Sequence, residues 1–140
     1  MKEIFNLYIS VLLLLFLSVT GLCLITTGVH MRAADSFSAA AVAELENSHF
    51  HPLVIDRVGE QASRCGYQWE VTLFFSDGSK EELIYGTEEP RQNAEEKGVD
   101  GTQVISALTI LSYDYNIPFF YAGFGNDRTM TRHEIRAFAT

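Results

Sequence analysis

This 140-residue sequence has no charged side chain between Ile4 and Val29, a run of 26 residues. About 20 apolar residues suffice to cross the hydrocarbon core of a bilayer as a helix. The Ser and Thr hydroxyls within the run can bond to helix carbonyls. The run therefore predicts a transmembrane anchor over residues 1–30. A cleaved secretion signal is the alternative, but the run continues well past the small-residue site at 19–21, which favours an anchor.

Cysteine is also scarce, with two in the whole chain. Cys23 lies inside the apolar run and Cys65 lies far beyond it, so we do not expect the two to form an internal disulfide. We expect Cys65 to be a small buried apolar side chain. An intermolecular or reactive thiol is the alternative.

Basic residues are few: ten Lys and Arg stand against eighteen Asp and Glu, giving a net charge of −8. All of this excess lies in the part that follows the apolar run, because Lys2 and Glu3 cancel before it. An acidic domain repels phosphate groups, which argues against nucleic acid and anionic membrane surfaces as partners.

Catalytic motifs are missing as well. No serine has a nucleophile motif around it, and the glycines at 123 and 125 do not form a phosphate loop. His49 and His51 lack further ligands for a zinc site, which is the weaker alternative to two surface histidines. The Glu pairs at 81–82, 88–89 and 95–96 predict a solvated edge and an acidic loop over 86–102, with calcium binding as the alternative. We expect no enzymatic activity, no cofactor and no metal.

Neither proline nor glycine occurs from Val29 to Ser48, and residues 31–48 contain six alanines. Alanine has the highest helix propensity. An apolar stripe follows helical spacing at Ala34, Phe37, Ala41 and Leu45. The sequence therefore predicts one continuous helix from about residue 4 to 48, roughly 65 Å long at 1.5 Å per residue.

The rest of the chain predicts one short helix and an antiparallel sheet. Pro52 suits the first turn of a helix, and Gly66 suits its C-terminal cap. The expected inner face of this helix is Leu53, Ile55, Val58, Ala62 and Cys65. Two-residue periodicity predicts strands near 69–75, 80–86, 103–115 and 129–139, of which the first two form a hairpin and the third is central. The fold class is α+β, with a sheet of about four strands laid on helices.

Aromatic side chains gather after the third predicted strand. Their function is either to fill the core and a covered sheet end or to form an exposed interaction patch, since aromatics are enriched at interfaces. The residues concerned are Tyr113, Tyr115, Phe119, Phe120, Tyr121 and Phe124.

The whole arrangement resembles type IV pilin-like proteins, and most closely the TadE-like pseudopilins. Three stretches carry the resemblance: the charge-poor "IFNLYISVLLLLFLSVTGLCLITTG", the helical "AADSFSAAAVAELENS" with "VIDRVGEQASRCGYQWEVTL", and the carboxy-terminal "LSYDYNIPFF" with "MTRHEIRAFAT". The resemblance implies a pilin-like structural subunit of a Tad-type pilus or a related secretion or conjugation apparatus. Residues 31–140 would then form an extracytoplasmic domain on a single-pass anchor.

In such proteins the apolar helix anchors the subunit and then packs against helices of neighbouring subunits, through small residues that allow close approach. The resemblance also gives Glu3 the role of the pilin glutamate that pairs with a neighbour's amino terminus. The expected partners are the membrane, other pilin-like subunits with their assembly machinery, and copies of the same chain. The expected assembly residues are Glu3, Gly21, Gly28, Ala34, Phe37, Ala41 and Leu45, and an Asp at 37 or 45 should abolish assembly. The alternative is a bitopic membrane-anchored binding module that holds its partner in the acidic loop or the aromatic patch.

Overall fold

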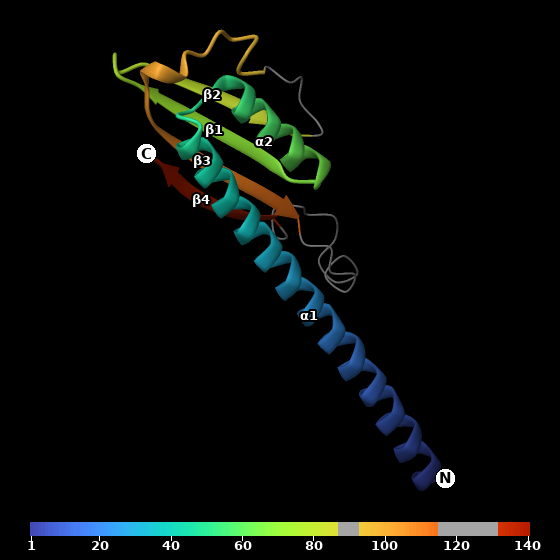
Figure 1. Cartoon of the computed structure of the whole chain (residues 1–140). Coiled ribbons are helices and arrows are strands. Elements are labelled where there is room, and N and C mark those ends of the chain that lie inside the picture. Colours follow the sequence, from blue (N-terminus) through green and yellow to red (C-terminus); the bar gives the residue numbers. More distant parts are fainter. Residues whose placement is uncertain (87–92, 115–131) are drawn as a thin grey trace.

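The computed structural model describes residues 1–86, 93–114 and 132–140. The elements follow the order α1 (Lys2–Asn47), α2 (Pro52–Arg64), β1 (Gln68–Phe75), β2 (Lys80–Tyr85), the 3₁₀ turn η1 (Gly101–Gln103), β3 (Val104–Asp114) and β4 (Arg132–Ala139). Figure 1 shows a small domain of sheet and helices at one end of a long projecting helix. The predicted α+β class is confirmed.

The helix α1 runs unbroken for 46 residues, as the alanine-rich sequence predicts. Its amino-terminal half projects away from the domain, and its carboxy-terminal half lies against the sheet (Figure 1). No cap or breaker separates the two halves at residue 30, where the predicted anchor ends. The backbone therefore connects the apolar half to the domain through helical hydrogen bonds alone.

The chain turns sharply between α1 and α2. His49 and Phe50 adopt left-handed backbone angles, with φ of 52° and 58°. The Phe50 amide donates to the Leu45 carbonyl at 3.0 Å, which closes the end of α1. The His51 side chain accepts from the Leu53 amide at 3.3 Å, and Pro52 occupies the first turn of α2. His51 thus serves as a helix cap.

The sheet has the strand order β2-β1-β3-β4, and each neighbouring pair is antiparallel. The expected hairpin of β1 and β2 and the interior position of β3 are both confirmed. The β1–β3 register shifts between Phe74 and Phe75, which pair with Ser106 and Val104. Ile105 lies at this irregularity, which explains why it is exposed although strict alternation would place it on the same face as the buried Ala107.

One face of the sheet packs on both helices. The carboxy-terminal half of α1 covers β3 and β4, and α2 covers β1 and β2. The largest fully buried side chains come from both layers: Trp69, Tyr85, Leu45, Ile55, Leu73, Leu83, Leu111, Val71 and Thr109. The predicted inner face of α2 is correct at Ile55, Val58 and Ala62 and wrong at Leu53, which is exposed. Leu53 lies two residues from Ile55, or about 200° around a helix of 3.6 residues per turn.

Candidate functional site

The amino-terminal half of α1 exposes its apolar side chains to the surroundings. The most apolar 18-residue window of this helix is 0% buried, and its length and composition suffice for one membrane span. The hydroxyls in the run are satisfied locally: for example, those of Ser10 and Thr20 donate to carbonyls four residues earlier at 2.8 Å. An apolar helix whose hydroxyls bond internally fits a hydrocarbon environment.

The stripe predicted for assembly has a different partner in the structure. Ala34, Ala41 and Leu45 are buried in the core of their own domain, and Phe37 is partly buried against it. Their contacts are with the sheet of the same chain, and an Asp at Leu45 would place an unpaired charge in that core. Loss of assembly in such a variant would therefore report on folding rather than on contacts between subunits.

The remaining predicted assembly residues lie on the projecting part of α1. Glu3 is exposed in the first turn. Gly28 is exposed and Gly21 is half-buried. Within the described residues, a Cβ built at either glycine meets nothing within 4 Å. Neither glycine is therefore required by packing inside the domain, and their role toward other helices stays a prediction.

The predicted aromatic patch is represented by Tyr113 alone, because Tyr115, Phe119, Phe120, Tyr121 and Phe124 lie outside the described residues. Tyr113 is 7% exposed and belongs to the core. Its ring contacts those of Tyr67 and His133, with centroids 5.9 and 5.4 Å apart. At this position the core interpretation of the sequence is correct.

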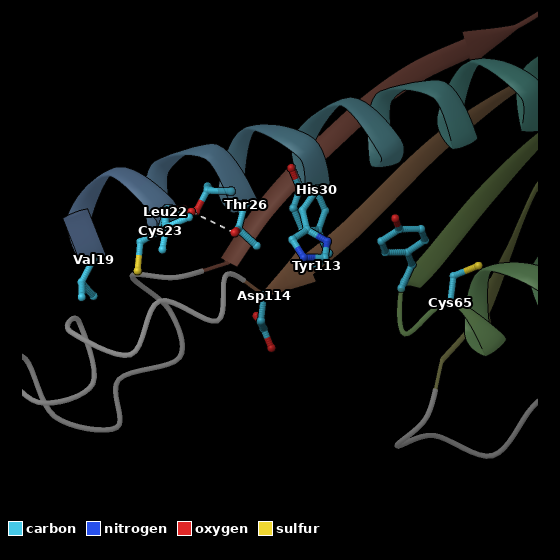
Figure 2. Close-up of a pocket in the computed structure, with 10 residues that line it drawn as sticks. Val19, Leu22, Cys23, Thr26, His30, Cys65, Tyr113 and Asp114 are labelled. Atoms are coloured by element: carbon cyan, nitrogen blue, oxygen red, sulfur yellow. Dashed lines mark hydrogen bonds between the residues drawn. The ribbon is translucent and has the colours of Figure 1, made fainter.

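Cys65 departs from its expected position, because the structure exposes it at the C-terminal cap of α2. Cys23 is half-buried on α1. Both cysteines are free, and Figure 2 shows them at opposite ends of one pocket. The expectation of no internal disulfide fits this arrangement, and the expectation of a buried Cys65 is wrong.

This pocket has a volume of about 470 Å³ and lies between α1 and the end of the sheet. Figure 2 shows α1 along one side of it, with β3 and the region after α2 on the other. Such a volume is typical of small-molecule sites. The described residues that line it are Val19, Leu22, Cys23, Thr26, Thr27, His30, Cys65, Tyr67, Tyr113 and Asp114.

The wall of the pocket is held by a series of aromatic contacts. The Phe37 ring lies 5.5 Å from that of Tyr67, which in turn contacts Tyr113. Burial raises the pKa of the Tyr67 hydroxyl, with a further contribution from Cys65, so this hydroxyl stays neutral at physiological pH. Asp114 is the single formal charge among the described lining residues. Sequence reasoning does not find this pocket, because its lining comes from three distant segments without a common motif.

The described part of the acidic loop predicted over 86–102 packs on the domain. The Asp56 carboxylate accepts from the Tyr85 hydroxyl at 2.6 Å and from the amides of Ala94 and Glu95 at 2.6 and 3.1 Å. Nearby, the Lys97 ammonium pairs with the Glu81 carboxylate at 2.8 Å. Residues 94–98 of this loop form a turn. Within the described ranges, no three His, Cys, Asp or Glu side chains gather as a metal site.

Neither a protein-family model, nor a curated protein, nor a solved structure matches the chain.

Proposed function

We propose that this chain is a pilin-like (pseudopilin) structural subunit of a Tad-type pilus or a related secretion or conjugation apparatus. The amino-terminal half of α1 anchors the subunit by a single membrane span, and the domain lies on the extracytoplasmic side. During assembly the same half of α1 packs against helices of other subunits. The observation that carries the proposal is the unbroken 46-residue α1, which joins an apolar, unburied half to a folded domain.

The continuity of α1 matters for mechanical reasons. A flexible stalk would leave the orientation of the domain independent of the anchor, whereas a continuous helix fixes one relative to the other. Subunits that pack through their apolar helices would then present their domains in a regular arrangement. In lipid the drive for such packing is van der Waals contact between closely fitting helices, because the hydrophobic effect is already satisfied.

Burial of the stripe limits which surface can contact other subunits. Because Ala34, Ala41 and Leu45 are used within the domain, the assembly surface must lie on the amino-terminal half and on the exposed faces of the carboxy-terminal half. Gly21 and Gly28 remain the best candidates for close approach, since they carry no side chain and a Cβ built at either meets no described atom within 4 Å.

The test is chemical crosslinking in membranes of the native host, comparing wild type with Gly21→Leu and Gly28→Leu. A Cβ at either position meets no atom of the described residues within 4 Å, so we expect both variants to fold. The matched control is Leu24→Phe, which adds volume at another exposed position of the same segment. We expect the glycine variants to lose crosslinks to like or pilin-like subunits while the control retains them. A wild-type protein that stays monomeric in membranes would contradict the proposal and favour the bitopic binding module.

A further inference from the structure

We propose that the pocket beside α1 binds a membrane lipid with an ammonium headgroup, of the ethanolamine or choline class. The lipid headgroup lies at Asp114, Tyr67 and Tyr113, and the first part of an acyl chain follows α1 past Leu22 to Val19. This inference rests on the membrane anchoring in the proposed function and is independent of assembly into a filament.

The position of the pocket along α1 points to a lipid. The helical residues that line it extend from Val19 to His30, and the charge-free run ends at Val29. If the run fills the bilayer, these turns extend from its outer boundary at His30 to roughly 16 Å deeper at Val19, a range that covers a headgroup and the first part of an acyl chain. Figure 2 shows the pocket extending along α1 from His30 toward Val19. Lipid is the ligand present there at the highest concentration.

The lining changes its chemistry along the same direction. Toward Val19 the lining on α1 consists of Val19, Leu22 and Cys23, which suit hydrocarbon. Toward His30 the lining is polar: α1 contributes Thr26, Thr27 and His30, and the other side contributes Cys65, the two tyrosine rings and the Asp114 carboxylate. This amphipathic gradient matches a molecule with a polar head and an apolar chain.

Charge selects the class of headgroup. Among the described lining residues there is no Lys or Arg. Asp114 is the last residue of β3, and its side chain is exposed. The Asp114 carboxylate attracts an ammonium group through charge, and the tyrosine rings elsewhere in the lining attract it through their quadrupole. The same carboxylate repels a lipid with a net negative head. A zwitterionic lipid can place its ammonium at Asp114 and its phosphate toward water.

The experiment is native mass spectrometry of the full chain released from nanodiscs that contain equal amounts of phosphatidylethanolamine and phosphatidylglycerol. We expect one retained lipid per chain, with phosphatidylethanolamine preferred. Asp114→Asn should lower that preference by about three- to tenfold, the range expected for one partly exposed charge contact. The control is Asp35→Asn, which removes the same charge from an exposed position of α1 outside the pocket and should leave the preference unchanged.

Two further measurements identify the site. Thr26→Trp should fill the pocket and abolish the retained lipid, while circular dichroism checks that the domain stays folded. Cys65, an exposed thiol in the lining, should react more slowly with a maleimide in nanodiscs containing phosphatidylethanolamine than in nanodiscs of phosphatidylglycerol alone. The proposal is overturned if no lipid is retained, if phosphatidylglycerol is preferred, or if the folded Thr26→Trp variant retains lipid as wild type does. A monomeric protein that still retains the lipid would contradict filament assembly and leave the lipid site supported.

Discussion

Substitutions at two leucines of α1 distinguish the role of this helix in folding from its role in anchoring. Leu45 is 0% exposed in the core, whereas Leu12 is 54% exposed in the apolar half of α1. Leu45→Ala removes buried methyl groups and leaves a cavity, which costs about 2–5 kcal/mol in a well-packed core. A domain of this size has a free energy of unfolding of about 5–15 kcal/mol, so the loss is a large fraction of its stability. Leu12→Ala removes the same atoms from a side chain without contacts in the core and should leave the stability of the domain unchanged.

Thermal unfolding in detergent measures this difference. The chain has a single tryptophan, Trp69, which is 1% exposed and packs against the Tyr85 ring with centroids 5.7 Å apart. Its fluorescence therefore reports the integrity of the core. At about 4 °C per kcal/mol for a domain of roughly 100 residues, Leu45→Ala should lower Tm by about 8–20 °C. An unchanged Tm combined with loss of crosslinks between subunits would refute the assignment of this stripe to the core.

Three other predictions concern the contact between α2 and the sheet. Asp56→Ala leaves the buried Tyr85 hydroxyl and the Ala94 amide without their acceptor, so urea denaturation should show a loss of about 2–5 kcal/mol in the free energy of unfolding. Asp56→Glu keeps the charge but moves the carboxylate, so it should recover little of that loss. Gly59→Ala places a methyl group against the Tyr85 ring and should cost about 1–3 kcal/mol in the same assay; wild-type stability would show that the ring can move. Burial and the hydrogen bond to Asp56 raise the pKa of Tyr85, so the folded state holds the phenol proton more tightly than the unfolded chain. Stability should therefore be full below about pH 10 and fall as the pH rises above it, less so in Tyr85→Phe; an equal fall in both would assign the effect to another group.

Local sequence determines much of this fold. A long apolar run that continues without proline into alanine-rich sequence predicts α1 over Lys2–Asn47, because the hydrogen bonds of a helix lie within the segment itself. The same holds for the start of α2 at Pro52 and for the hairpin turn, where Gly78 has a positive φ of 85° and the Asp77 carboxylate accepts from the Ser79 amide. Alternation likewise predicts the buried face of β1, since side chains on a strand point to opposite sides in turn.

Tertiary structure decides which partner each apolar surface meets. The stripe at Ala34 and Leu45 is equally compatible with a contact between subunits or within one, because periodicity gives a face and not its neighbour. Packing on β1 and β2 decides which face of α2 is buried, and Leu53 lies outside that face; Cys65, at the C-terminal cap, is also exposed.

Some candidate sites follow from the local sequence, and others exist only in the folded chain. The sequence by itself determines the apolar helix that is long enough for a membrane, since hydropathy is a property of consecutive residues. The pocket and the three hydrogen bonds of Asp56 exist only after folding, because they join side chains that are far apart in the chain. Contacts of this kind depend on strand order and helix placement, which no local pattern encodes.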